Sequence, residues 1–177
     1  MTTLNEQTII RQTVLNVAQL MVTAAITAPK GRGISHLHTC IVVDEDKQAV
    51  IEQMRSLAKE FSLPSFERDA RNLENADALV LLGTALEPMG LKLCGMCGFE
   101  NCDAKRKQPH IPCVFNPGDL GIALGSAVSV AMDNRIDNRI LYSAGQAALR
   151  MGIFPPEVKI IYGVALSVSK KNIFFDR

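Results

Sequence analysis

Four of the five cysteines lie in one short segment, which limits the fold of this chain more than any other feature. Cys94, Cys97 and Cys102 fall within nine residues, and Cys113 follows after a gap of ten. A thiolate is a soft ligand that binds iron–sulfur clusters and zinc, and a pair of cysteines two residues apart can reach one metal from a single turn. The segment therefore predicts a loop folded around a metal.

The spacing favours an iron–sulfur cluster over zinc. Zinc sites usually combine two close pairs of ligands, whereas here one pair is followed by two single cysteines. Gly95 and Gly98 each follow a cysteine directly, where a glycine lets the backbone bend around a cluster and turn amide N–H groups toward it. We predict one [4Fe–4S] cluster, with zinc as the alternative metal. The predicted ligands are Cys94, Cys97, Cys102 and Cys113.

Two neighbouring features leave alternatives open. His110 lies inside the segment, and it either replaces a sulfur ligand or is an ordinary loop residue. The basic run 105–107 (Lys-Arg-Lys) has three interpretations. It stabilises a negatively charged cluster, it docks an acidic electron carrier, or it is simply solvated.

Composition excludes several classes of partner. Lys and Arg total 19 and Asp and Glu total 18, so a net charge of +1 gives no electrostatic reason to expect nucleic acid or an anionic membrane. The N-terminus lacks the pattern of a signal peptide, and no run approaches the ~20 apolar residues of a membrane span. We expect a cytoplasmic protein, and a reducing compartment disfavours disulfides for these cysteines.

The pattern along the chain predicts helices and strands in one domain, 1–177, with a Cys-rich metal-binding insertion at 84–116. A helix start is predicted at Asn116, which suits the N-cap, with Pro117 at the first helical position and Asp119 in the first turn. Pro64 is predicted to end an earlier helix. A small-residue stripe at 118, 121, 125 and 129 favours close helix packing over a flat cofactor. The expected helices are 5–26, one from 44–46 to Pro64, 116–132 and 146–151; the expected strands are 39–43, 78–82 and 160–166.

A second candidate site follows the first predicted helix. Lys30, Gly31, Arg32 and Gly33 place two cations between glycines that allow close approach of the backbone to a ligand. The segment is interpreted either as a cradle for an anion or phosphate, or as a flexible basic loop.

Several segments carry a resemblance to a known family over nearly the whole chain. They are AAITAPKGRGI from Ala24, CGMCGFENC from Cys94, DLGIALGSAV from Asp119, DNRILYSAGQAALRMG from Asp137 and KNIFFDR from Lys171. With these the chain resembles the prokaryotic DUF2148 family of ferredoxin-domain proteins. The CGMCGFENC core also resembles the small four-cysteine [4Fe–4S] domains of corrinoid iron–sulfur proteins and electron-transport complexes. These resemblances imply a ferredoxin domain and a metal rather than a particular reaction.

A further resemblance, over 24–43 and 119–166, is to FMN-dependent nitroreductases. It implies an α+β fold with three layers, helix/sheet/helix, into which the Cys-rich loop is inserted. It also implies that Lys30 and Arg32 contact the phosphate of FMN. The sequence departs from the nitroreductase pattern in its cysteine insertion and in lacking the second set of basic flavin contacts near the C-terminus, where Lys170 and Lys171 are the candidates to substitute.

Two functions from different classes fit these features. The first is a redox protein that binds a [4Fe–4S] cluster and FMN. It would act either as a flavin and iron–sulfur oxidoreductase or as an electron carrier for a partner protein. The second is a binding or assembly module in which a structural zinc holds a long loop. The apolar tail 171–177 is expected to dock on a second subunit in a homodimer. The sequence contains no Ser/His/Asp hydrolase elbow, no Walker loop and no paired acid/base carboxylates at a telling spacing, which disfavours hydrolysis and phosphoryl transfer.

Overall fold

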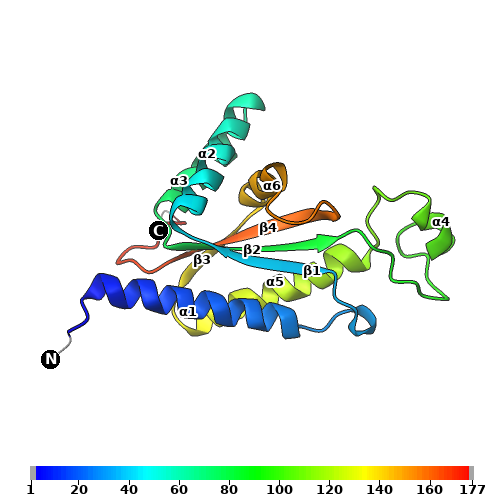
Figure 1. Ribbon diagram of the computed structural model, residues 1–177, viewed down its shortest axis with the longest axis horizontal. Coiled ribbons are helices and arrows are strands. Elements are labelled where there is room, and N and C mark those ends of the chain that lie inside the picture. The colour runs from blue at the N-terminus through cyan, green and yellow to red at the C-terminus, as the bar shows by residue number, and fades with distance from the viewer. Residues whose placement is uncertain (1–2, 176–177) are drawn as a thin grey trace.

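The computed structural model describes residues 3–175 and has a four-stranded sheet between two layers of helices (Figure 1). Helices α1 and α5 cover one face of the sheet, and α2, α3 and α6 cover the other. The predicted three-layer α+β architecture is confirmed. The helices are α1 (Glu6–Thr27), η1 (Gly31–Gly33), α2 (Asp44–Glu60), α3 (Pro64–Glu74), α4 (Cys102–Arg106), α5 (Phe115–Asp133) and α6 (Tyr142–Met151). The strands are β1 (Leu37–Val42), β2 (Ala78–Ala85), β3 (Asp137–Leu141) and β4 (Val158–Ser167).

The sheet has the order β1-β2-β4-β3, and all neighbouring strands are antiparallel. Strand β2 is buried along its whole length and divides the core in two. Val80 and Leu82 pack with α1 and α5, whereas Leu79 and Leu81 pack with the helices on the opposite face. Successive side chains of a strand point to opposite faces, so a continuous apolar run is the expected sequence of a strand covered on both sides.

Helix α1 begins and ends close to the predicted residues. Asn5 is its N-cap, and the Asn5 side-chain oxygen accepts a hydrogen bond from the Thr8 amide at 2.9 Å. By length and composition alone α1 is long enough and apolar enough to cross a membrane, contrary to the expectation above. Core helices of soluble proteins meet the same criteria. In this fold Val17 and Met21 lie on a buried stripe of α1.

Helix α3 was not predicted. Helix α2 ends at Glu60, before the expected break at Pro64, and Pro64 instead stands at the first turn of α3, where the missing N–H of proline is not needed. Phe66, Ala70 and Leu73 form the buried face of this short helix. Proline thus separates two helices here rather than ending helical structure.

The small-residue stripe on α5 does not pack within the chain as favoured above. Gly118, Gly121, Gly125 and Ser129 are exposed, and a Cβ atom added at any of the three glycines would meet no atom within 4 Å. The buried face of α5 instead contains leucine and alanine, including Leu120 and Leu124.

The end of the predicted tail docks on the core of its own chain. Phe174 is only 4% exposed and belongs to the core beneath α2, α3 and α6. Its carbonyl oxygen accepts a hydrogen bond from Arg139 at 2.7 Å. Residues 176–177 of the tail lie outside the described residues.

Candidate metal centre

The cysteine segment projects beyond one end of the sheet, opposite the end where α1 begins (Figure 1). Strand β2 ends at Ala85 and α5 begins at Phe115, so residues 86–114 form the insertion, two residues shorter at each side than predicted. We call residues 86–114 the cysteine loop. The short helix α4 lies within it and begins at Cys102, with Asn101 as its N-cap. The cysteine loop is therefore attached to two long core elements at its base.

The first turn of the cysteine loop depends on glycine. Gly95 has φ 130° and Gly98 has φ 84°, conformations that side chains with a Cβ rarely adopt. The Gly98 amide donates a hydrogen bond to the Gly95 carbonyl oxygen at 2.9 Å, which closes a tight turn containing Cys97. The expected role of these glycines in bending the backbone beside the cysteines fits this geometry.

The thiols differ in their surroundings. Cys113 is 4% exposed, whereas Cys94, Cys97 and Cys102 are half-buried. The Cys102 sulfur lies 3.9 Å from the Leu91 carbonyl oxygen. All these cysteines are free thiols.

The donor set fits an iron–sulfur cluster by its chemistry, because one loop supplies four thiols. In this conformation the thiols do not converge. Within residues 3–175, no three side chains of His, Cys, Asp or Glu are grouped closely enough to hold a metal ion. His110 is exposed. Ligation by the four cysteines would therefore require the loop to close, as is common where metal binding is coupled to folding.

Asn116 ties the two ends of the cysteine loop together. This residue is 2% exposed, and its Oδ1 accepts a hydrogen bond from the Cys113 amide at 2.9 Å. Its Nδ2 donates to the Glu87 carbonyl oxygen, also at 2.9 Å. The prediction that Asn116 is an N-cap was wrong, because α5 begins at Phe115 and Val114 occupies the cap position, two residues earlier than predicted. The side chain stabilises the base of the loop instead.

Within the basic loop 30–33, Lys30 closes the end of helix α1. Its Nζ donates to the carbonyl oxygens of Ala25, Ile26 and Ala28 at 2.9, 2.8 and 2.7 Å. A cation suits this end of a helix, where carbonyl groups lack partners. Burial lowers the pKa of Lys30, and the negative charge of Asp119 partly opposes that shift.

The rest of the basic loop joins α5 and the cysteine loop. The Gly31 amide donates to the Asp119 carboxylate, at 3.2 and 3.1 Å to its two oxygens. Arg32 Nη1 donates to the Met89 carbonyl oxygen at 3.0 Å and lies 3.5 Å from that of Gly90. A Cβ atom on Gly31 would lie 2.8 Å from the Met89 side chain, so the two loops are in close contact. The structure thus brings the two predicted sites side by side.

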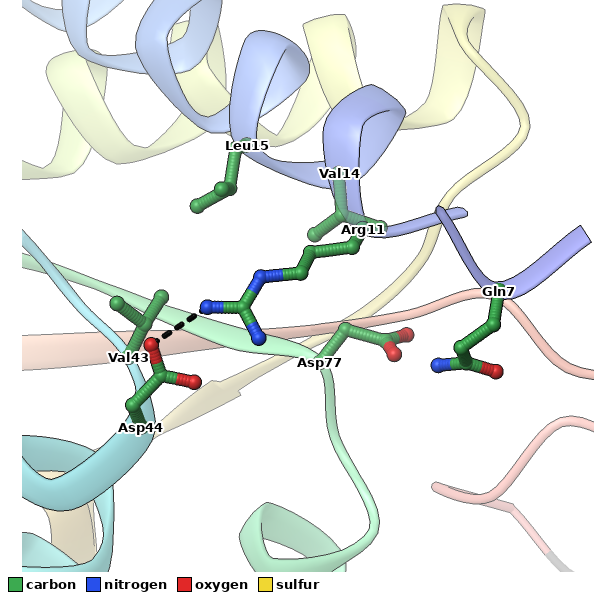
Figure 2. A pocket seen from close by; sticks show the side chains of 7 residues that line it. All are labelled: Gln7, Arg11, Val14, Leu15, Val43, Asp44 and Asp77. Atoms are coloured by element: carbon green, nitrogen blue, oxygen red, sulfur yellow. Dashed lines mark hydrogen bonds and ion pairs between the residues drawn. The ribbon is translucent and has the colours of Figure 1, made fainter. Parts of the chain in front are cut away.

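A small polar cavity of about 90 Å³ lies at the other end of the molecule, beside the start of α1 (Figure 2). Arg11 points into it and pairs with Asp44 at 2.7 Å. Asp77 accepts a hydrogen bond from the Val168 amide at 2.8 Å. The first contact joins α1 to the start of α2, and the second joins the residue before β2 to the residue after β4, so both connect elements of the fold.

Comparison with known proteins supports the fold and the ferredoxin domain. The family model described as "Uncharacterized protein containing a ferredoxin domain (DUF2148)" matches residues 110–177. An uncharacterized protein of Archaeoglobus fulgidus is 35% identical over 181 aligned residues, which cover 98% of this chain and 97% of the relative. The alignment to this relative therefore spans the cysteine loop.

Solved structures share the three-layer architecture. A nitroreductase with bound FMN from Desulfitobacterium hafniense is 16% identical, with a TM-score of 0.59 over 88% of this chain and 78% of the other. A putative nitroreductase in complex with FMN from Desulfovibrio desulfuricans is 12% identical, with a TM-score of 0.59 over 89% and 75%. A BluB-like flavoprotein from Clostridium difficile is 18% identical, with a TM-score of 0.56 over 97% and 84%. The predicted nitroreductase-like fold is confirmed.

Proposed function

The chain belongs to DUF2148, the family of proteins that contain a ferredoxin domain, and on this basis we propose that it is a redox protein with one [4Fe–4S] cluster. The observation that carries the proposal is the cysteine loop itself. It holds four free thiols on one projecting segment, attached at its base to the sheet and to α5. A cluster bound there would supply the acceptance and release of single electrons.

In this proposal the cluster ligands are Cys94, Cys97, Cys102 and Cys113. The glycines that follow the first two ligands give the backbone the positive φ values of a tight turn. Asn116 fixes the backbone of Cys113 relative to the start of the loop. The exposed position of the loop suits electron exchange with a partner protein. We place this activity in the cytoplasm, where reducing conditions keep thiols available as ligands.

We further propose that the basic loop 30–33 binds the phosphate of FMN. Support comes from its position, because Arg32 already contacts the cysteine loop and a ligand held there would lie beside the metal site. Lys30 and Arg32 donate to backbone carbonyl groups in this structure, so a phosphate would have to compete for both cations. Flavins exchange one or two electrons, which would make such a pair an oxidoreductase centre.

Anaerobic purification followed by iron, sulfide and zinc analysis tests the cluster. We expect iron and sulfide in equal amounts and a visible absorption band that bleaches with dithionite. The Cys97→Ser variant should lose the iron, whereas Cys40→Ser should retain it, because Cys40 lies on β1 in the core. Stoichiometric zinc without iron would instead support the binding module with a structural metal.

Reconstitution with FMN tests the flavin site separately. Replacing Arg32 with methionine should weaken FMN binding by about tenfold, the loss expected for one charge-assisted hydrogen bond. The matched control is Arg135→Met, since Arg135 is also exposed but lies at the far end of α5. Equal affinities of wild type and both variants, or no binding by the wild type, would leave the basic loop as a structural element only.

A further inference from the structure

Lys105 is the most unusual charged residue of the cysteine loop. It is 1% exposed and is among the largest fully buried side chains of the described residues. Its two basic neighbours, Arg106 and Lys107, are exposed, and Arg106 pairs with Asp103. The basic run 105–107 is therefore divided by the fold into one internal cation and two surface cations.

The ammonium group of Lys105 has little compensation inside the protein. Its Nζ donates to the Leu86 carbonyl oxygen at 3.3 Å, and residues 3–175 provide no ion pair to it. An ammonium has three N–H donors, so a single long bond leaves most of its hydrogen-bonding capacity unused. Burying a charge is costly unless it is paired and hydrogen-bonded. The position therefore calls for a negative partner that residues 3–175 do not provide.

The geometry of α4 places this cation on the side of the cysteines. Cys102 and Lys105 are three residues apart on one helix, so their side chains lie on the same face. Both face the incoming part of the cysteine loop, where Cys102 lies near the Leu91 carbonyl oxygen and Lys105 near that of Leu86. Lys105 thus reaches the end of β2 from the face of α4 that also carries Cys102.

We infer that Lys105 is the internal counter-charge of the metal centre and that it raises the reduction potential of the bound cluster. This inference rests on the proposed function. A [4Fe–4S] cluster with four thiolate ligands has a net charge of about −2, and gaining one electron from an external reductant makes it more negative. A fixed positive charge nearby stabilises the reduced form more than the oxidised form, and a buried charge is less screened by water and salt than an exposed one.

Replacement of Lys105 with methionine should have opposite effects on the two states of the protein. In the metal-free protein it removes a poorly compensated buried charge, so the free energy of unfolding should stay the same or increase. In the iron-loaded protein it should lower the equilibrium constant for reduction by about tenfold, or roughly 59 mV in midpoint potential for a one-electron couple. A residue that only fills space would not change the potential in this way.

Two control variants complete the experiment. Lys107→Met removes the same charge from an exposed position two residues away, and it should change the reduction equilibrium about twofold or less. Lys105→Arg keeps the charge and should retain most of the wild-type potential. The measurements are urea unfolding of the metal-free proteins and anaerobic redox titration of the loaded ones.

The outcomes separate this inference from the proposed function. Wild-type protein that takes up no iron and sulfide overturns both, and the metal analysis shows this before any variant is made. If the wild type is loaded but the Lys105 and Lys107 methionine variants have equal potentials, only the role of Lys105 is overturned. A metal-free Lys105→Met protein that unfolds more easily than the wild type, or does not fold, identifies Lys105 as a packing residue and also overturns it.

Discussion

Replacing Asn116 with alanine should destabilise the base of the cysteine loop. The substitution removes both hydrogen bonds of the side chain, each 2.9 Å long, and leaves the Cys113 amide and the Glu87 carbonyl group without these partners. Asn116 is 2% exposed, so water has little access to either group. An unsatisfied buried polar group costs about 1–3 kcal/mol, and two such groups cost about 2–6 kcal/mol.

The assay is urea unfolding of the metal-free protein, followed by circular dichroism. The transition midpoint of Asn116→Ala should fall with little change in slope, because the native core remains intact. Asn101→Ala is the matched control, since Asn101 also bonds a backbone amide at 2.9 Å but is exposed at the N-cap of α4. A lost N-cap costs about 1 kcal/mol. Equal losses in the two variants would show that Asn116 does not hold the loop.

The same change should lower the iron content of reconstituted protein, because Cys113 loses the bond that fixes its backbone. Full iron occupancy in Asn116→Ala, together with the expected loss of stability, would separate the stability of the loop base from metal binding.

Three further predictions concern the core. Burial raises the pKa of Cys40 to about 11, so at pH 8 its thiol should react with iodoacetamide more slowly than an unperturbed cysteine. The reaction rate should increase as the pH approaches 11, and mass spectrometry of timed samples measures that rate. A rate that does not depend on pH would contradict the raised pKa. Gly145→Ala should destabilise the protein by about 3 kcal/mol or more in urea unfolding, because a Cβ atom there would lie 1.8 Å from a β4 carbonyl oxygen. Gly118→Ala is the control: a Cβ atom there meets no atom within 4 Å, so the substitution should stabilise α5 by about 0.5–1 kcal/mol. Similar changes in stability in the two variants would contradict the close packing of α6 on β4. Phe174→Ala should lower the free energy of unfolding by about 3–5 kcal/mol, because this side chain is buried in the core of its own chain. If the tail docked on a second subunit instead, the loss of stability would depend on protein concentration.

The sequence was sufficient for the elements with strong periodicity. Helix α1 has an apolar stripe and was predicted close to its observed ends, and β2 is a continuous apolar run whose start was predicted, although the strand continues past Gly83 to Ala85. Helix α3 was missed because Pro64 was interpreted only as a stop signal, although proline also suits the first turn of a new helix. The small residues of α5 were predicted to pack against another helix because their spacing places them on one face. That spacing does not tell which face of the helix points toward the core, and this face is exposed.

The ligands of the candidate site are a prediction from cysteine spacing alone, whereas its supporting contacts could not be predicted from the sequence. The spacing of the cysteines carries a chemical meaning without any structure. In contrast, Arg32 and Met89 are 57 positions apart, and no local pattern indicates that they touch. The burial of Lys105 was also hidden, because it lies in a run of charges that is indistinguishable from a solvated surface until the short helix α4 is seen. Asn116 predicted the start of a helix, but its side chain instead accepts a hydrogen bond from the Cys113 amide at the base of the cysteine loop.

The ties at the base of the cysteine loop have a consequence for the entropy of metal binding. The segment is held at Glu87 by Asn116, at Met89 and Gly90 by Arg32, and at Cys113 by Asn116 again. If the thiols converge on a metal as proposed, only the part between these anchors would have to lose conformational freedom. Preorganisation of this kind strengthens binding without adding a single contact to the ligand. In the proposed metal centre, the nitroreductase-like core would thus contribute to metal affinity from outside the coordination sphere.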